Sequence, residues 1–427
     1  MPCTATLATS VSGPTGALQA GGAESCLLAA KTARDLWRRK HPRLVAEQKV
    51  PRLVAPATVH AAFHKASELF DLQLDLVPCA ADGTVRAKDM VKHLDKDVAL
   101  VVVSAPSYPT GVLDPVEEVA KAAEERGVSC HVDACFGGMI LPWIKGLPHW
   151  DFRVPGVTSM SADLHKYGYA PKGVSVLLHR GRARHRAQFF ALTTWAAYPV
   201  VNPTLLGSKS ASPLASAWAI MRFLGEDGYD SLTASCVRAS QRIQECFQQI
   251  PGLKVQGEPV GPALALVADT SVPRDQQVDP HHLADEMARL GFKIQHQPGH
   301  IQSDGVKIPH SAHLTITPVT EATLPEFCAA LEAGAAAVRG QARPKVELQL
   351  RLLRLLGYGT RNRVPTPEMA WRILRFAGAG GESLPGNMAP LMALVERLPE
   401  PVAEVLLSEL LARVSEPGTA TSQVAGA

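Results

Sequence analysis

The feature that most constrains the fold is an alternation of apolar, strand-like runs with helix-forming segments between residues 52 and 134. Val98–Ser104 reads VALVVVS, an unbroken apolar run that is typical of a strand buried on both faces of a parallel sheet. Parallel strands need crossover connections, and helices on both faces of the sheet provide them. The sequence therefore predicts an α/β fold with a mostly parallel sheet. The expected strands are Arg52–Ala57, Leu72–Pro78, Val98–Ser104 and Ser129–Ala134, and the expected helices are Cys26–Lys40, Thr58–Phe70, Lys88–Leu94 and Asp114–Arg126.

The length of the chain, 427 residues, is sufficient for two or more structural units. Short strands and helices after residue 225 predict a smaller α/β domain, and a Leu/Arg-rich amphipathic helix at Val346–Leu356 belongs to a helical extension. We expect the extension to pack on the main body or on a partner; contact of its Leu/Arg face with a membrane surface is the alternative. The expected units are a flexible lead-in (1–20), a large domain (21–225), a small C-terminal α/β domain (226–342), a helical extension (343–416) and a disordered tail (417–427). The further expected strands are Leu253–Gln256, Pro262–Ala268 and His313–Thr317, and the further helices are Pro213–Gly225, Ser231–Ile250, His281–Leu290, Thr320–Arg339, Pro367–Phe376 and Met388–Val414.

Charge and cysteine usage argue against several classes of protein. The 43 Lys and Arg residues nearly balance the 40 Asp and Glu residues, whereas binding of nucleic acid normally needs a concentrated basic face. No window approaches the roughly eighteen consecutive apolar residues of a transmembrane helix, so we expect none. The 8 cysteines are scattered without a CxxC pair or zinc-type spacing, which predicts reduced thiols in the cytoplasm and neither a disulfide framework nor a metal site.

A glycine pair precedes the first expected helix, in the segment Gly21–Ser25. Glycines allow close approach of the backbone, and the free N–H groups of a first helical turn attract anions. The segment therefore predicts a phosphate seat, with an ordinary loop before a helix as the alternative.

An aspartate closes the strand that ends in Cys130–Ala134, and the glycines of CFGG follow it. Ligands of parallel sheets bind at the carboxyl ends of the strands. We interpret Asp133 as a carboxylate that pairs with a cationic heterocycle nitrogen and keeps it protonated; a helix cap or turn residue is the alternative.

The stretch Ser161–Gly173 lies between two further strand-like runs, Val154–Met160 and Val174–His179, and contains Lys166 among aromatic and small residues. A lysine that attacks an aldehyde must lose its proton near neutral pH, and partial burial lowers the pKa of an ammonium group. We therefore expect a lowered pKa for Lys166, in preference to an ordinary solvated lysine.

The motifs HVDACFGG and SADLHKYGYAPKG resemble the sphingosine-1-phosphate lyase family, within the larger group of pyridoxal-dependent decarboxylases. GGAES, VAPATVHAAFHKA, SAPSYPTGVLDPVEEVAK and QFF…NPTLLGSKS extend the similarity over roughly residues 13–340. The resemblance implies the fold type I architecture of aspartate aminotransferase and the cofactor pyridoxal 5′-phosphate.

The resemblance also implies roles for individual residues. Lys166 would form the Schiff base with the cofactor aldehyde, and His165 would contact the phosphate or assist proton transfer. Asp133 would bind the pyridinium nitrogen, which makes the ring an electron sink, and His60 would stack on the ring face. The implied phosphate seat comprises Gly22, Ala23 and Ser161, with Gly207 and Ser208 reaching it from the second subunit of a homodimer.

The implied reaction is retro-aldol cleavage of a phosphorylated sphingoid base to a long-chain aldehyde and phosphoethanolamine. The sequence departs from the family pattern at three positions: Ala23 replaces a threonine, Lys209 an arginine and Thr194 an aspartate. The chain also begins almost at the cofactor loop, so we expect it to lack the N-terminal region that carries the membrane anchor in the family. With such an anchor the location would be the endoplasmic reticulum membrane.

Two other functions remain open from the sequence. An amino-acid decarboxylase of the same group would use the same lysine, aspartate and histidine, although Tyr167–Pro171 favours the lyase. A catalytically weak relative or fragment that serves as a dimer partner is the other alternative, which Ala23 and Lys209 favour and the retained Lys166 opposes.

Overall fold

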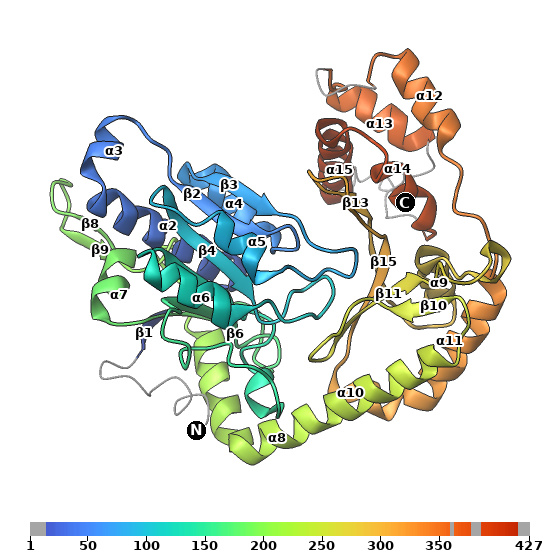
Figure 1. The fold of residues 1–427 in the computed structure, drawn as a ribbon, viewed down its shortest axis with the longest axis horizontal. Coiled ribbons are helices and arrows are strands. Elements are labelled where there is room, and N and C mark those ends of the chain that lie inside the picture. The colour runs from blue at the N-terminus through green and yellow to red at the C-terminus, as the bar shows by residue number, and fades with distance from the viewer. Residues whose placement is uncertain (1–13, 359–362, 377–385, 417–427) are drawn as a thin grey trace, which may run out of the picture.

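The computed structural model describes residues 14–358, 363–376 and 386–416, and a seven-stranded sheet forms its large domain (Figure 1). The strand order is β1-β7-β6-β5-β4-β2-β3. Strands β2 to β6 run parallel, while β7 is antiparallel to β6 and β1 is antiparallel to β7. The predicted mostly parallel α/β architecture is therefore confirmed. The strands are β1 (Thr15–Gln19), β2 (Arg52–Pro56), β3 (Gln73–Val77), β4 (Val98–Ser104), β5 (Ser129–Asp133), β6 (Ser159–Asp163) and β7 (Ser175–His179).

The central strand β4 shows why an unbroken apolar run forms a buried strand. All of its residues are buried, and successive side chains point to opposite faces of the sheet. Leu100 and Val102 join the apolar cluster of helices α2 and α4, whereas Val101 and Val103 join the cluster of α6 on the other face. The helices are α2 (Gly22–Lys40), α3 (Pro42–Ala46), α4 (Ala61–Phe70), α5 (Ala87–Lys92), α6 (Val116–Glu125) and α7 (Arg182–Gln188), with the short elements η1 (Leu141–Trp143), β8 (Phe190–Leu192) and β9 (Val200–Asn202).

Three local expectations for the large domain are wrong. Thr15–Gln19 pair with β7 as strand β1, although they were expected to belong to a flexible lead-in. Strand β6 begins at Ser159, because the residues from Val154 onward form turns instead. Helix α6 begins at Val116 instead of at Asp114, because Pro115 is its N-cap and Asp114 accepts a hydrogen bond from the backbone N–H of Ser104 at 2.7 Å.

The small domain packs helices against a four-stranded antiparallel sheet of order β10-β11-β15-β12. Helix α8 (Ser212–Gln248) runs from the large domain to the small one along the lower edge of Figure 1. At Gly225 the backbone leaves helical geometry (φ 60°, ψ −166°), and this kink divides α8 into two helical segments, in agreement with the two helices predicted on either side of it. The remaining elements are β10 (Leu253–Val255), β11 (Ala263–Ala268), η2 (Arg274–Gln276), α9 (Pro280–Arg289), β12 (Gln295–Gln297), β13 (His300–Ile301), β14 (Lys307–Ile308), β15 (Ser311–Thr315), α10 (Pro318–Ala322) and α11 (Leu324–Val338).

A disulfide between Cys246 and Cys328 joins α8 to α11. The expectation that all cysteines are reduced thiols is therefore wrong for this pair, which is separated by 82 residues in the sequence. The five cysteines described as free are all buried, in agreement with the apolar runs in which they lie.

The helical extension has an apolar core of its own, built from four helices above the small domain in Figure 1. It is tied to the small domain by Asp285 of α9, whose carboxylate accepts hydrogen bonds from the backbone N–H groups of Met388 (2.9 Å) and Ala389 (3.0 Å). The helices are α12 (Glu347–Leu355), α13 (Pro367–Phe376), α14 (Ala389–Val395) and α15 (Glu400–Ser415), the last two replacing the single predicted helix 388–414.

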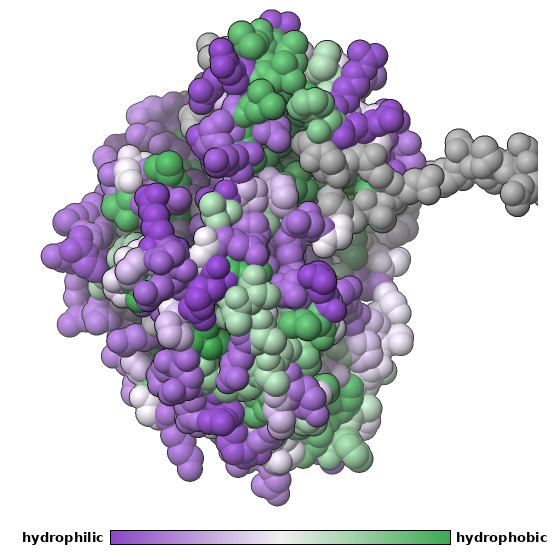
Figure 2. All heavy atoms as spheres, turned by 90° about the vertical axis from the view of Figure 1, so that its right-hand side faces the viewer, coloured by the Kyte–Doolittle hydropathy of each residue, from purple (hydrophilic) through white to green (hydrophobic). Residues whose placement is uncertain are grey.

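Apolar side chains gather on the outer face of α12, at the top of Figure 2, with hydrophilic residues on either side. Leu348 and Leu355 are among the exposed residues of this helix. The membrane contact considered for this face stays a prediction. No helix in the described parts of the chain is long and apolar enough to cross a membrane, and the predicted tail 417–427 lies outside the described residues.

Candidate active site

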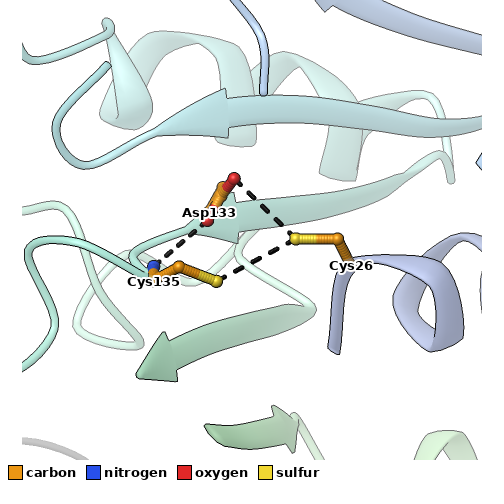
Figure 3. A group of neighbouring side chains, drawn as sticks. All are labelled: Cys26, Asp133 and Cys135. Carbon is orange, nitrogen blue, oxygen red and sulfur yellow. Dashed lines mark hydrogen bonds between the residues drawn. The ribbon is translucent and has the colours of Figure 1, made fainter. Parts of the chain in front are cut away.

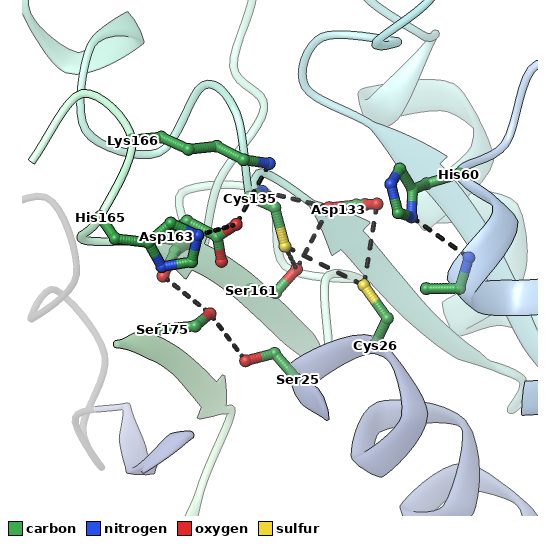
Figure 4. A network of polar contacts seen from close by, with 12 residues as sticks. Ser25, Cys26, His60, Asp133, Cys135, Ser161, Asp163, His165, Lys166 and Ser175 are labelled. Carbon is green, nitrogen blue, oxygen red and sulfur yellow. Dashed lines mark hydrogen bonds and ion pairs between the residues drawn. The ribbon is translucent and has the colours of Figure 1, made fainter. Parts of the chain in front are cut away.

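Two aspartates lie side by side at the carboxyl edge of the large sheet. Asp133 is the last residue of β5, and Asp163 is the last residue of the neighbouring parallel strand β6. The turn after β6 brings Lys166 back over Asp163, with 3.1 Å between Nζ and Oδ2 (Figure 4). The strand-end rule that selected Asp133 in the sequence applies equally to Asp163, which was missed.

Asp163 is only 2 % exposed and is approached by groups from two segments, the turn after β6 and the start of α2. Besides Lys166, the Nε2 atom of His165 lies 3.6 Å from its Oδ2 atom. A Cβ atom on Gly22 would lie 2.5 Å from the same oxygen, so only glycine fits at this start of α2. The other carboxylate oxygen, Oδ1, is buried and has no hydrogen-bond partner within the described residues. The first turn of α2 thus approaches a buried carboxylate, whose charge the positive end of the helix dipole stabilises.

The Asp163 carboxylate determines the ionisation of Lys166. Burial alone lowers the pKa of Lys166, but the negative charge of Asp163 outweighs burial and raises that pKa above its ordinary value. The lowered pKa expected from the sequence is therefore wrong. Lys166 is an ammonium group at neutral pH, paired with Asp163, in this form of the protein.

Asp133 lies in a dense network of donors. Its Oδ1 atom accepts from the backbone N–H of Cys135 (3.1 Å) and the hydroxyl of Ser161 (3.4 Å), and its Oδ2 atom accepts from the thiol of Cys26 (3.8 Å). Burial raises the pKa of Asp133, but His131, His60 and the Cys135 amide overcome this effect and hold the pKa below its ordinary value. Asp133 is consequently a carboxylate at neutral pH, the state that an ion pair with a protonated ring nitrogen requires.

Ser161 lies at this end of the site. It is fully buried, its hydroxyl lies 3.2 Å from Nε2 of His131, and the Cys135 thiol donates to it at 3.2 Å. The phosphate contact expected for Ser161 would need an accessible hydroxyl. In the structure that hydroxyl is buried and hydrogen-bonded within the Asp133 network instead.

Cys26 and Cys135 form a pair beside Asp133 that the spacing of cysteines in the sequence did not indicate (Figure 3). Their sulfur atoms are 3.9 Å apart, and with Asp133 they form the one compact group of metal-ligand side chains found in the described residues. The hydrogen bond to Cys135 lowers the thiol pKa of Cys26, but burial and the charge of Asp133 outweigh it, so this pKa is raised overall. The thiol pKa of Cys135 is raised by its hydrogen bond to Cys26 and by burial. Both therefore stay neutral thiols that donate hydrogen bonds within the Asp133 network.

His60 lies at the open side of Asp133 (Figure 4). It is the N-cap of α4 rather than a residue within that helix, and its Nδ1 atom accepts from the backbone N–H of Ala62 at 3.2 Å. This bond fixes the ring while leaving the residue exposed. A fixed and accessible imidazole suits stacking on a flat ligand ring.

The phosphate end of the site is held together by Glu24. Its two carboxylate oxygens accept from the backbone N–H groups of Ala20 (2.6 Å) and Leu205 (2.8 Å), which brings the loop after β9 to the first turn of α2. Lys209 adds a bond from its Nζ atom to the carbonyl of Leu18 at 2.7 Å. The three expected contact residues Ala23, Gly207 and Ser208 are exposed at this loop and turn.

An apolar cavity of about 610 Å³ borders Lys166 on the side of the small domain. Aromatic side chains form much of its wall, and two of them are fixed by hydrogen bonds: Tyr167 donates to the carbonyl of Ile316 (2.8 Å) and Tyr108 to Oε1 of Gln295 (2.9 Å). Lys166 lines this cavity, whereas Asp133 and His60 do not. The lining residues are Tyr108, Phe136, Lys166, Tyr167, Tyr169, Leu232, Thr315, Thr317, Pro318 and Val319.

Comparison with known proteins identifies one family over most of the chain. The profile of the family described as "Pyridoxal-dependent decarboxylase conserved domain" matches residues 4–265. A second profile, a C-terminal helix-turn-helix domain of pyridoxal-dependent enzymes, matches residues 350–413, the helical extension.

Individual relatives carry the name sphingosine-1-phosphate lyase. The protein from Arabidopsis thaliana is 36% identical over 71% of this chain and 52% of its own length, and that from Rattus norvegicus is 33% identical over 71% of this chain and 50% of its own length. The chain thus spans about half the length of the curated relatives it matches.

Solved structures agree with these relatives. A sphingosine-1-phosphate lyase from Burkholderia pseudomallei superposes with a TM-score of 0.69 at 31% identity, covering 83% of this chain and 76% of that one. A glutamate decarboxylase from Lactobacillus brevis reaches a TM-score of 0.70 at 19% identity, covers 80% of each chain, and supports the fold alone.

The residues present fit pyridoxal 5′-phosphate. Lys166 supplies an amine, Asp133 a carboxylate that is charged at neutral pH, His60 an exposed ring and α2 an N-terminal first turn. These groups gather at the carboxyl edge of one sheet, where ligands of parallel sheets bind. The chain therefore belongs to the pyridoxal-dependent decarboxylase family of fold type I enzymes, whose cofactor is pyridoxal 5′-phosphate, and within it groups with the relatives of sphingosine-1-phosphate lyases.

Proposed function

We propose that this protein is a carbon–carbon lyase that cleaves a phosphorylated sphingoid base into a long-chain aldehyde and phosphoethanolamine. The observation that carries the proposal is the apolar cavity of about 610 Å³ beside Lys166. A hydrocarbon chain needs a wall of this kind, since each buried methylene contributes about 0.8 kcal/mol to binding. The names of the relatives with 31–36% identity support the same substrate class.

When bound, pyridoxal 5′-phosphate supplies an electron sink for the negative charge that develops at the substrate carbon next to nitrogen. Asp133 keeps the ring nitrogen protonated, because its own pKa is held low by its donors. His60 would cover one face of the ring, and Lys166 would hold the cofactor through its Nζ atom.

His165 and Asp163 are proposed to control proton transfer at Lys166. His165 donates through Nδ1 to the carbonyl of Val174 at 2.7 Å, which leaves Nε2 directed toward Asp163. Cleavage requires that a base take the proton of the substrate's C3 hydroxyl as the Cα–Cβ bond breaks, and that the Cα atom receive a proton afterwards. The Asp163–Lys166 ion pair holds a proton at Nζ, and Lys166 also lines the apolar cavity, so this ammonium group is the proposed proton donor for the second step.

The proposed assembly is a homodimer whose subunits share the site. Large apolar side chains are exposed over the β8–β9 hairpin and the first turns of α8, with Val201 66%, Trp218 64% and Phe223 88% exposed. A surface of this kind favours burial against a second copy. In that arrangement Gly207 and Ser208 of one subunit contact the phosphate in the other. Phe223→Asp is expected to lower the apparent mass in sedimentation to that of a monomer, and an unchanged dimer would argue against this surface.

The function is tested by product analysis of the cofactor-saturated protein. With a phosphorylated sphingoid base we expect a long-chain aldehyde and phosphoethanolamine in equal amounts. Carbon dioxide release from an amino acid, without aldehyde formation, would establish the decarboxylase alternative instead. If the protein takes up the cofactor but forms neither product, the lyase proposal is overturned and the function as a dimer partner remains.

A further inference from the structure

A second cavity, of about 620 Å³, lies at the opposite edge of the large sheet from the candidate active site. Strand β5 joins the two places, because Ser129 at its start lines the cavity and Asp133 at its end lies in the site. The cavity is bounded by the C-terminal end of α2, by the starts of β4 and β5, and by the segment that follows β7. None of the proposed catalytic steps uses it.

The charge of this cavity is strongly positive. Its basic lining residues are Arg39, Lys40, Arg180 and Arg184, and Glu124 is the one acidic residue among those that line it. The C-terminal end of α2 also lies in this region, and its partial negative charge offsets part of one positive charge. Four cations against one carboxylate leave a formal excess of three positive charges on the cavity wall, which the helix end reduces in part.

Arg184 is the most constrained of these groups. Its Nη1 atom donates to the hydroxyl of Ser129 at 3.0 Å, and no ion pair to a carboxylate is found for it in the described parts of the chain. Burial lowers the pKa of Arg184, and the like charge of Arg180 lowers it further. Glu124 partly offsets the charge of Arg180, whereas burial and Arg180 both disfavour the charge of Arg184, so an anion beside the two guanidinium groups would stabilise them.

Arg180 is fixed more firmly. Its Nε atom donates to the carbonyl of Val157 (2.7 Å), and its Nη2 atom donates to the carbonyls of Phe152 (2.8 Å) and Val154 (2.9 Å). These bonds leave the two N–H groups of Nη1 for another acceptor. The cavity therefore has one rigid guanidinium and one that is anchored at a single hydroxyl.

Apolar groups line the rest of the wall, among them Leu36, Val98 and Pro155. The volume lies within the range of about 300–1,000 Å³ that is usual for small-molecule sites. Cationic groups beside apolar walls match a molecule with a phosphate at one end and an apolar or aromatic body. We propose that this cavity binds a soluble phosphorylated small molecule, with Arg184 and Arg180 holding its phosphate.

The test uses the full-length protein saturated with pyridoxal 5′-phosphate, so that added phosphates cannot occupy the cofactor's own phosphate seat. Calorimetry is carried out with inorganic pyrophosphate, ADP and adenosine as probes. We expect saturable binding of pyrophosphate and ADP that weakens with added salt, stronger binding of ADP, and none of adenosine, with no change in cofactor absorbance. Absence of saturable binding by both phosphates would overturn the proposal.

Matched variants locate the binding. Arg184→Gln is expected to weaken ADP binding at least about tenfold, the scale of one charge-assisted, paired contact. Arg186→Gln, an exposed arginine of the same helix that does not line the cavity, should leave it unchanged. Arg39→Gln, at an exposed position of the cavity rim, weakens binding without risk to folding. Equal affinities for the Arg184, Arg39 and Arg186 variants would contradict a site in this cavity.

Discussion

The two ends of the cofactor site are built in different ways. At the ring-nitrogen end, Asp133 (7% exposed) and Ser161 (0% exposed) belong to adjacent strands, and their positions are set by the sheet. At the phosphate end, Ala23, Gly207 and Ser208 are exposed residues of a helix start and a loop. The groups that control the chemistry are thus fixed within one chain, whereas the groups that hold the anion depend on loops and, as we propose, on a second subunit.

The largest effect is expected from removing Lys166, one of the groups that control the chemistry. Lys166→Ala is expected to lower the rate of aldehyde formation by at least about a thousandfold, since loss of a group that forms a covalent intermediate costs this much or more. Mass spectrometry after borohydride treatment should detect no cofactor attached to the variant. Lys172→Ala, an exposed lysine of the same loop, is the control and should retain both properties.

Neutralising the carboxylate at the ring nitrogen comes next in size. Asp133→Asn keeps the shape of the side chain but removes the charge, and we expect about a hundredfold lower rate, as for other preorganised electrostatic groups. Cofactor content is measured in parallel by absorbance. A variant that binds the cofactor and cleaves substrate at the normal rate would show that the rigid end does not control the chemistry.

The Asp163–Lys166 pair predicts a change in pH dependence. Asp163 raises the pKa of Lys166, so Asp163→Asn removes the negative charge that stabilises the ammonium form and should lower that pKa. In the cofactor-free protein, the pH above which Lys166 reacts with added pyridoxal should move to lower values, with a change in activity of several-fold. An unchanged pH threshold would mean that the Asp163 charge does not set the pKa of Lys166.

The smallest effect is expected at the phosphate end. Ala23→Thr restores a hydroxyl on the first turn of α2, and one additional hydrogen bond contributes about 1 kcal/mol, or roughly fivefold tighter cofactor binding. Ala23→Val has a similar shape without the hydroxyl and serves as the control. If both variants bind the cofactor equally, the exposed end does not gain from a hydroxyl at this position.

Sequence patterns predicted what depends on local periodicity. Val98–Ser104 forms β4 with the predicted bounds, because a strand buried on both faces must be apolar throughout. Asp133 was found by the same reasoning, since the position of a residue at a strand end follows from the strand itself.

Features that depend on distant parts of the chain were not predicted. The pKa of Lys166 follows from Asp163, whose burial requires the close approach of Gly22 more than a hundred residues earlier in the sequence. The disulfide between Cys246 and Cys328 likewise depends on how α8 packs against α11. Burial and charge pairing of this kind are set by tertiary packing, which periodicity does not encode.

Helix α8 has a consequence for how the protein tolerates change in length. Tyr229 and Cys236 belong to the apolar core of the large domain, and Ala239 and Ile243 to that of the small domain, with continuous helix between them. Because each helical residue adds about 100° of rotation and 1.5 Å of rise, one residue inserted between Cys236 and Ala239 would turn the small domain about the helix axis. The walls of the cavity beside Lys166 come from both domains, so a single insertion at this point would separate them without altering any residue of the site.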